Sequence, residues 1–315
     1  MSLAAAKYRA QQYARIREHF FNQDVLEVET PLLSRGVAVD CHIDLFSTRY
    51  IADGMRPEDG KLFYLQSSPE LFMKRMLSQG FPSIYQITKA FRQGETGKHH
   101  NPEFTLLEWY RLGFDFRSLI DDVRRVCQLV LGELRVSIQS YQTLFIQHTG
   151  IDPLTASQDD LQAYLDSQGK SYVPFNRKDD LLNFIFSDTI EACLPPDTLV
   201  FVYHYPREMP GLALLDKNDP RIAKRFEAYY NGVELCNGYE ELTNSTEYKE
   251  RFTHENEKRR EIHKPPLPLD KAFLSALTQP LPSCSGVALG LDRLLMLGLK
   301  HDSLNEVIHF PSTKH

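Results

Sequence analysis

The sequence predicts an α+β fold in which an antiparallel sheet is flanked by helices, and three segments carry this prediction. Residues 91–110 alternate in polarity as two strands joined by a charged loop. Residues 225–242 form a second alternating pair around Asn231-Gly232, a dipeptide typical of a tight hairpin turn. Residues 285–299 run from a glycine-punctuated strand into an apolar helix. Hairpins pair their strands antiparallel, so these segments favour a mainly antiparallel sheet.

The rest of the chain is expected to supply helices and one insertion. A helix-like stretch at residues 5–22 leads to a short strand that ends at Pro31, because proline cannot donate a backbone hydrogen bond. Residues 137–197 look helical in pieces, and strand character resumes at 199–205. We interpret 137–197 as a helical insertion within a single domain that spans residues 1–315.

Composition limits the function classes. The 315 residues are 42% hydrophobic, enough for one large core, and no apolar run approaches the roughly 18 residues that span a membrane. The five cysteines are scattered without a CxxC pair, which argues against a disulfide framework or a zinc site and favours a cytoplasmic protein. A net charge of −6 offers no general attraction for nucleic acid. A local basic cluster is interpreted as a solvated helix face: Lys258, Arg259, Arg260 and Lys264.

The second strand of the first hairpin has a face suited to ligand binding. Period-2 alternation places Phe104, Leu106, Glu108 and Tyr110 on one side, and Arg92 leaves the neighbouring strand. A ring, a carboxylate, a phenol and a guanidinium together suit a small ligand that carries a flat base, a phosphate and an amine. The segment alone leaves an ordinary amphipathic hairpin as the alternative.

The second hairpin predicts a metal site. With Asn231-Gly232 in the turn, Tyr229 lies opposite Glu234, and Glu227 is the diagonal neighbour of Glu234 on the same face. Diagonal pairs lie roughly 7–8 Å apart, so both carboxylates could reach one cation, and Mg²⁺ is the cation that shares oxygen ligands with phosphates. Two solvated glutamates on an edge hairpin are the alternative.

Two further polar residues of this hairpin have the wrong parity for the same pocket. Asn237 and Glu241 alternate to the face opposite Glu234 unless the strand contains a bulge, and Gly238 is the residue expected to tolerate one. Simple alternation would leave Glu241 outside.

In this order, the N-terminal helix and strand, the first hairpin and the C-terminal strand and helix resemble motifs 1, 2 and 3 of class II aminoacyl-tRNA synthetases. The resemblance is strongest to the lysyl-tRNA synthetase core, through SPE (68–70), HNPEFT (100–105) and ELCNGYEEL (234–242). It covers about residues 8–112 and 200–310. It implies a class II catalytic core that uses ATP and Mg²⁺ and is homodimeric through its first helix and strand.

The resemblance also implies where ATP binds. Arg92 would bind the substrate carboxylate and the α-phosphate, and Arg293 would clamp the γ-phosphate, so both are predicted catalytic residues. Phe104 would stack on adenine. The predicted ATP-binding residues are Arg92, Gly94, Glu95, His100, Asn101, Phe104, Glu234, Leu235, Gly290 and Arg293, and the predicted magnesium ligands are Glu227 and Glu234.

The amino acid site follows from the same resemblance. Glu70 and Glu108 would meet the amino group nearer the carboxylate, whereas Glu241 and Tyr110 would meet a distal ammonium. The predicted substrate-binding residues are Ser68, Pro69, Glu70, Arg92, Glu108, Tyr110, Asn237, Glu241 and Ala288.

Three positions depart from the lysyl-tRNA synthetase pattern. Gly94 stands where motif 2 has a glutamate and Glu95 follows it; His99 replaces an arginine; Ala288 replaces a glycine on the pocket floor. The chain is also expected to begin where the catalytic core begins, without an anticodon-binding barrel before it.

Three features together resemble the elongation factor P lysine ligase family: the expected beginning of the chain at the catalytic core, Ala288 and the acidic net charge. The resemblance implies activation of a lysine, preferentially (R)-β-lysine, as an adenylate, and its transfer to a lysine of elongation factor P. A compact lysyl-tRNA synthetase is one alternative, although tRNA is not the expected partner. A non-catalytic regulatory paralogue is the other, and it would be expected to lose Arg92, Arg293 or the Glu227–Glu234 pair. The sequence leaves α-lysine and both enantiomers of β-lysine open.

Overall fold

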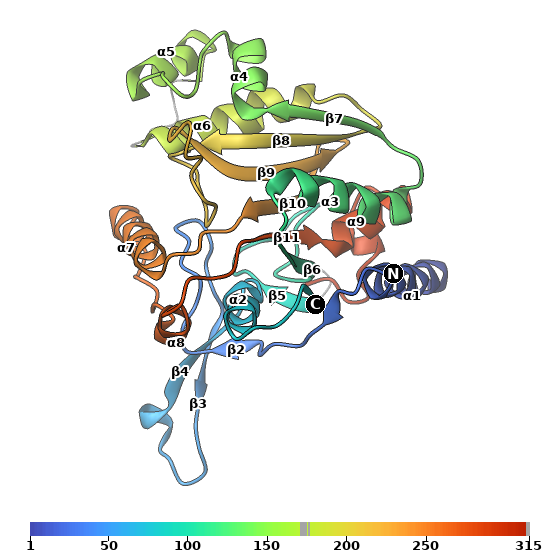
Figure 1. Cartoon of the computed structure of the whole chain (residues 1–315), viewed down its shortest axis with the longest axis vertical. Coiled ribbons are helices and arrows are strands. Elements are labelled where there is room, and N and C mark those ends of the chain that lie inside the picture. The colour runs from blue at the N-terminus through green and yellow to red at the C-terminus, as the bar shows by residue number, and fades with distance from the viewer. Residues whose placement is uncertain (171–174, 176, 313–315) are drawn as a thin grey trace.

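The computed structural model describes residues 1–170, 175 and 177–312, and an eight-stranded sheet runs through it (Figure 1). The strands lie in the order β1 (Leu26–Glu27), β5 (Ile84–Phe91), β6 (Glu103–Leu112), β11 (Cys284–Gly290), β10 (Val233–Glu240), β9 (Ile222–Tyr230), β8 (Thr198–Pro206) and β7 (Arg135–Ser140). Only the two edge pairs, β1–β5 and β7–β8, are parallel. The predicted α+β fold with a mainly antiparallel sheet is confirmed.

One face of the sheet packs against three helices, α1 (Leu3–Phe21), α3 (Phe116–Leu131) and α9 (Leu291–Gly298). Alternation sends Leu107 and Trp109 of β6 into this core, where both are fully buried. Trp109 Nε1 donates a hydrogen bond of 3.2 Å to Asp122 of α3, which satisfies its only polar atom. The opposite face of the sheet is therefore available for polar side chains.

The other face is bordered by α2 (Glu70–Ser78), α7 (Ser245–Glu261) and α8 (Lys271–Ala276), which share a second apolar cluster. The side chain of Asn244 caps α7 by accepting hydrogen bonds from the backbone N–H groups of Thr246 and Glu247. These helices stand around the centre of the sheet and leave space over β6, β11 and β10.

The segment from 137 to 197 covers the far end of the sheet. It contains α4 (Tyr141–Thr149), α5 (Gln158–Ser167) and α6 (Lys178–Ile185), followed by a π turn at Phe186–Ile190 and a 3-10 turn at Glu191–Cys193. Its start belongs to β7, an edge strand that the sequence interpretation missed and whose alternation is obscured because both faces are partly exposed. Residues 171–174 and 176 of this segment lie outside the described residues.

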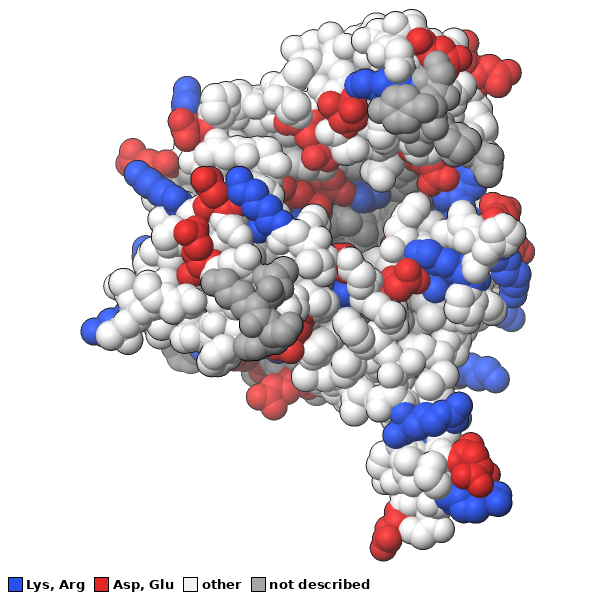
Figure 2. Space-filling view, turned by 180° about the vertical axis from the view of Figure 1, so that it is seen from behind, with Lys and Arg blue, Asp and Glu red and all other residues white. Residues whose placement is uncertain are grey.

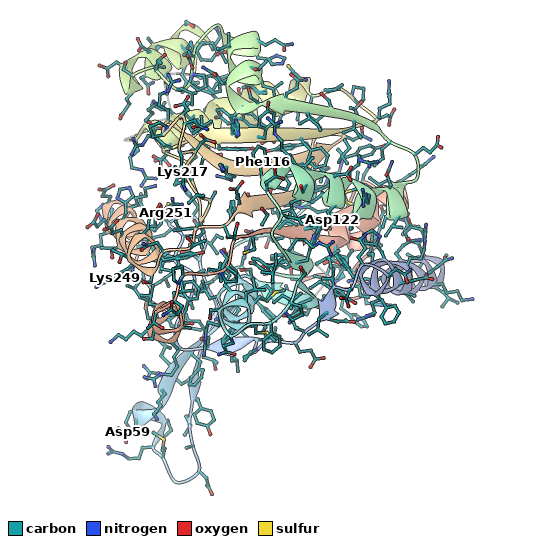
Figure 3. All side chains as sticks on the ribbon, in the orientation of Figure 1. Asp59, Phe116, Asp122, Lys217, Lys249 and Arg251 are labelled. Carbon is teal, nitrogen blue, oxygen red and sulfur yellow. The ribbon has the colours of Figure 1, made fainter. Side chains whose placement is uncertain are left out.

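A long hairpin projects from the body of the molecule (Figure 1). It consists of β3 (Ser47–Tyr50) and β4 (Lys61–Leu65), paired at its base with β2 (Leu33–Ser34), and Asp59 lies near its outer end (Figure 3). Across the described residues, no helix has the length and apolar character needed to cross a membrane.

Two of the four residues of the basic cluster differ from the solvated face that the sequence suggested, whereas Arg260 is exposed and Lys264 is half-buried. Lys258 and Arg259 are buried, at 7% and 2% exposure. Lys258 Nζ lies 2.8 Å from Asp179 of α6, and Arg259 lies 3.0 Å from Asp44. Burial of long basic side chains requires such partners, and here they tie the 137–197 segment and the 36–44 loop to α7.

Candidate active site

A cleft of about 750 Å³ lies over the centre of the sheet and opens between α2, α7 and the loops at 38–43 and 207–212. The space-filling view is hollowed between the upper part of the molecule and the part that carries α7, with acidic and basic side chains around the opening (Figure 2). Most of the predicted site residues line it: Ser68, Glu70, Arg92, Glu95, His100, Asn101, Phe104, Glu108, Tyr110, Glu234, Leu235, Asn237, Glu241, Ala288, Gly290 and Arg293.

Three predicted residues do not line the cleft. Pro69 is the N-cap of α2, and Gly94 lies in the loop after β5 with a positive φ of 86°. Glu227 is buried and does not line the cleft, although it pairs in register with Asn237 and so points to the same sheet face. Gly94 therefore adopts a left-handed backbone conformation, for which glycine is best suited. This is the position at which motif 2 of the lysyl-tRNA synthetase pattern has a glutamate.

A row of side chains crosses four strands beneath the cleft. Glu108 of β6 pairs in register with Ala288 of β11, Ala288 with Asn237 of β10, and Asn237 with Glu227 of β9. Directly opposed residues point to the same face, so these four side chains share the cleft side of the sheet. The predicted alternation of β6 is confirmed, and Ala288 lies between the two polar neighbours.

A bulge in β10 makes this row possible. The hairpin turn and the Glu234–Tyr229 pairing are as predicted, but the next pair is Cys236–Ala228, so Leu235 is the extra residue. The prediction of a bulge was right and its position at Gly238 was wrong. A Cβ at Gly238 would overlap the Phe226 ring, so this glycine serves close packing between β10 and β9.

Arg92 and Arg293 form the basic end of the cleft. Arg293 donates to the backbone oxygens of His99 at 3.1 Å and Glu234 at 2.9 Å, and its other nitrogen lies 2.8 Å from His100 Nε2. Burial and the Arg293 charge lower the pKa of His100, which keeps this imidazole neutral as an acceptor. His99, at the arginine position, therefore holds Arg293 through its backbone.

Arg92 is less constrained than Arg293. Its guanidinium lies 5.1 Å from the centre of the Phe104 ring and 3.6 Å from a carboxylate oxygen of Glu95. Glu95, one position after the glutamate of the family motif, thus lies close to Arg92. A guanidinium beside an aromatic face at a cleft wall can meet a phosphate or carboxylate while the ring remains available for stacking.

The opposite end of the cleft holds three carboxylates and one buried lysine. Lys74 of α2, fully buried, has its Nζ 2.5 Å from Glu70 Oε1 and 2.6 Å from Glu241 Oε2. Tyr110 donates a 2.7 Å hydrogen bond to Glu108 Oε1. Tyr110 therefore has Glu108 as its hydrogen-bond partner, and its expected contact with a distal ammonium, together with Glu241, stays a prediction. The sequence interpretation missed Lys74. Its signal was the four-residue spacing from Glu70 on a helix.

Burial disfavours the charged form of the carboxyl groups at this end of the cleft. It raises the pKa of Glu108 to about 8, helped by the Glu70 charge, and the pKa of Glu241 to about 7 despite the opposing charge of Lys74. Glu108 Oε2 is buried with no hydrogen-bond partner among the described residues. Such an oxygen is costly unless a ligand supplies a donor, so this end is suited to ammonium groups.

The two glutamates predicted to bind metal differ in their exposure and in the partners that they already have. Glu227 accepts from Arg225, Tyr205 and Tyr229, whereas Glu234 lies in the cleft with 43% of its side chain exposed. The Glu234 carboxylate lies 3.6 Å from an Arg293 nitrogen, and its exposure leaves it open to a cation bound in the cleft. The donor set fits a hard cation at Glu234, and Glu227 would share it only by loosening its ion pair with Arg225.

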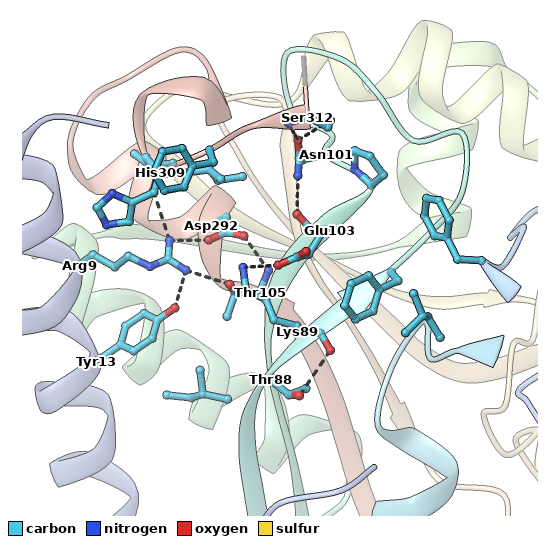
Figure 4. A pocket seen from close by; sticks show the side chains of 18 of the residues that line it. Arg9, Tyr13, Thr88, Lys89, Asn101, Glu103, Thr105, Asp292, His309 and Ser312 are labelled. Atoms are coloured by element: carbon cyan, nitrogen blue, oxygen red, sulfur yellow. Dashed lines mark hydrogen bonds and ion pairs between the residues drawn. The ribbon is translucent and has the colours of Figure 1, made fainter. Parts of the chain in front are cut away.

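A second and larger cavity, of about 900 Å³, lies on the opposite face of β5 and β6 (Figure 4). Its charged groups bind one another: Arg9 contacts Asp292 at 2.6 Å and Thr105 Oγ1 at 2.8 Å, and Asp292 accepts from the Thr105 backbone. The Asn101 amide donates to the Glu103 backbone and accepts from Ser312. These contacts join α1, α9 and the C-terminal segment to β6, so we place the chemistry in the first cleft.

A family model described as class II tRNA synthetases (D, K and N) matches residues 2–314 of the chain. The chain therefore belongs to the class II tRNA synthetase family, which confirms the predicted fold class. A relative from Pseudoalteromonas translucida is 43% identical over 99% of this chain and 97% of that protein. One from Vibrio parahaemolyticus is 42% identical over 98% and 96%. Both are named elongation factor P–(R)-β-lysine ligase, which agrees with the ligase predicted from sequence.

The raised pKa of Glu108 predicts how the stability of the ligand-free protein depends on pH. Between about pH 5 and 8 the unfolded chain has released this proton while the folded protein still holds it, so stability falls as pH rises. Glu108→Gln cannot ionise, so its free energy of unfolding should rise relative to wild type by roughly 1–4 kcal/mol across that window. Urea unfolding at several pH values measures this difference. Glu103→Gln, at an exposed position of the same strand, is the control, and parallel wild-type and Glu108→Gln curves would contradict the assignment.

Proposed function

We propose that this protein activates (R)-β-lysine, or lysine, as an aminoacyl-adenylate and transfers it to a lysine side chain of elongation factor P. The observation that carries the proposal is one cleft with Arg92 and Arg293 at one end and Glu70, Glu108 and Glu241 at the other. The first end suits phosphate and carboxylate, and the second suits amino groups. The names of the relatives supply the acceptor protein.

In the first step, the substrate carboxylate attacks the α-phosphorus of ATP, a carboxyl–phosphate bond forms, and the bond to pyrophosphate breaks. Both reactants are anionic, so Arg92 would hold them together and offset their repulsion. Arg293 would bind the departing phosphates, fixed by its contacts with His99 and Glu234. Phe104 would stack on the adenine.

In the second step, the amine of the acceptor lysine attacks the adenylate carbonyl. The carbon–nitrogen bond forms, the bond to AMP breaks, and the amine loses a proton. No enzyme nucleophile is required. Two cysteines line the cleft, Cys41 and Cys236. Burial and the Glu255 and Asp40 charges raise the pKa of Cys41 to about 12, and burial raises the pKa of Cys236, so both thiols stay protonated and unreactive.

We place Mg²⁺ at Glu234, with Glu227 behind it, where the ion would neutralise charge on the ATP phosphates. We also propose a cytoplasmic homodimer that pairs through α1 and β1. Exposed apolar side chains on these elements and near the C-terminus support the pairing: Phe21, Leu26 and Phe310.

The metal assignment predicts a contrast between two variants. Glu234→Gln should lower ATP–pyrophosphate exchange at least about 100-fold without changing the urea midpoint. Glu227→Gln should lower both, because it leaves Arg225 buried without its counter-charge, a loss of about 3–5 kcal/mol. Glu240→Gln, on the other face of β10, is the control. Near wild-type exchange by Glu234→Gln would remove the metal from this residue.

The position of Ala288 between Asn237 and Glu108 predicts a role in choosing the substrate isomer. A β-amino acid moves its ammonium one bond along the chain, and the pocket must absorb that shift beside this methyl. Ala288→Gly should raise α-lysine activation relative to (R)-β-lysine on the order of tenfold, since a methyl-sized change in fit is worth about 1–3 kcal/mol. Pyrophosphate exchange with each isomer gives the ratio, and an unchanged ratio would exclude Ala288.

The acceptor is tested by offering both macromolecules. Labelled lysine or (R)-β-lysine, ATP and the enzyme are incubated with elongation factor P or with tRNA, and acid-stable label is counted. We expect label on the protein and little on tRNA, because a net charge of −6 gives no general attraction for a polyanion. Efficient, salt-sensitive tRNA charging would instead indicate a compact synthetase.

A further inference from the structure

The amino-group end of the cleft contains a positive charge of its own. Lys74 does not line the cleft; it lies behind it, with its Nζ bound to one oxygen of Glu70 and one of Glu241. The rings of Tyr248 and Tyr110 have their centres 5.3 Å and 5.9 Å from the same nitrogen. The ammonium is therefore enclosed by carboxylates and aromatic faces, and a substrate cannot displace it without opening the core.

Counting charges shows what this lysine leaves for a ligand. Glu70, Glu108 and Glu241 all line the cleft, and Lys74 opposes only one of their three negative charges when all are ionised. The neighbouring titratable groups are the phenols of Tyr110, Tyr239 and Tyr248 and the thiol of Cys284. Burial raises the pKa of each, so they remain neutral.

We propose that Lys74 is a positioning residue that holds the Glu70 and Glu241 side chains at the cleft wall and offsets one of the three negative charges that the pocket carries once a ligand has displaced the Glu108 proton, so that the pocket selects an amino acid with two ammonium groups. This inference rests on the proposed function and specifies how that site recognises its substrate class. The second ammonium is as necessary as the first, since with only one of them a buried carboxylate stays uncompensated.

The geometry separates this role from that of an ordinary buried ion pair. Lys74 contacts two carboxylates that both reach the cleft, and its charge opposes proton uptake by Glu241 and Glu108. Without it, burial and mutual repulsion would raise the pKa of these carboxyls further, and a neutral carboxyl is a weak partner for an ammonium. A structural pair would affect folding alone.

A double-mutant cycle tests the proposal. The Michaelis constants for lysine and (R)-β-lysine are measured by ATP–pyrophosphate exchange for wild type, Lys74→Met, Glu241→Gln and the double variant. Glu241→Gln should raise them at least about 100-fold, because Lys74 then repels the substrate ammonium. The double variant restores two net negative charges and should recover about tenfold of that loss.

The pH dependence supplies a readout that a structural role would not move. Lys74→Met should raise the amino acid KM about tenfold or more at pH 7, and the ratio to wild type should shrink toward pH 8.5 as Glu241 and Glu108 ionise. The KM for ATP should not change, and urea unfolding shows whether each variant is folded. A double variant no better than Glu241→Gln, or a pH-independent ratio, would overturn the proposal.

A measurement on the wild-type protein applies even if the Lys74 variants do not fold. Norleucine, which has the carbon skeleton of lysine and one ammonium, should inhibit lysine activation at least about 100-fold more weakly than (R)-β-lysine does. Comparable inhibition would contradict the charge count. If the wild type activates neither lysine nor β-lysine, the proposed function fails as well. If it activates them and the cycle is additive, only the role of Lys74 fails.

Discussion

A buried carboxylate remains ionised only beside a positive charge, and this constraint organises the site. Glu108 and Glu241 are each 2% exposed, and Glu70 lies beside them, so their charges crowd together at one end of the cleft. Lys74 supplies one cation from inside the protein, and the substrate is expected to supply the others. The unpartnered oxygen of Glu108 is the point at which this arrangement is incomplete without a ligand.

The sheet brings these groups together through two local features. The Leu235 bulge turns Asn237 onto the face of Glu234, and the absence of a side chain at Gly286 leaves room for Tyr110 and Glu241. A Cβ at Gly286 would overlap the Tyr110 ring and lie 2.6 Å from a Glu241 oxygen. The backbone thus determines which side chains can meet over the cleft, and α1, α3 and α9 pack against the other face of the sheet.

Periodicity was sufficient for the parts of the site that lie on regular strands. The cleft face of β6 and the Asn231-Gly232 turn follow directly from alternation and turn chemistry. The bulge position did not, because Gly238 and Leu235 both permit it and only packing against Phe226 separates them. The sequence interpretation missed Lys74 and Arg225 because their roles depend on contacts between elements. Lys74 of α2 meets Glu241 just after β10, and Arg225 of β9 donates to Asn237 of β10 and to the Met209 backbone.

The most direct test of this account is the number of protons released when the diamino acid binds. Glu108, with a pKa of about 8 in the free protein, should lose its proton when an ammonium arrives. Calorimetric titration of (R)-β-lysine into the protein at pH 7, in buffers of different ionisation enthalpy, gives that number. The account predicts release of about one proton per substrate bound, declining toward zero as the pH rises above 8. Binding without proton release, or with proton uptake, at pH 7 would contradict it.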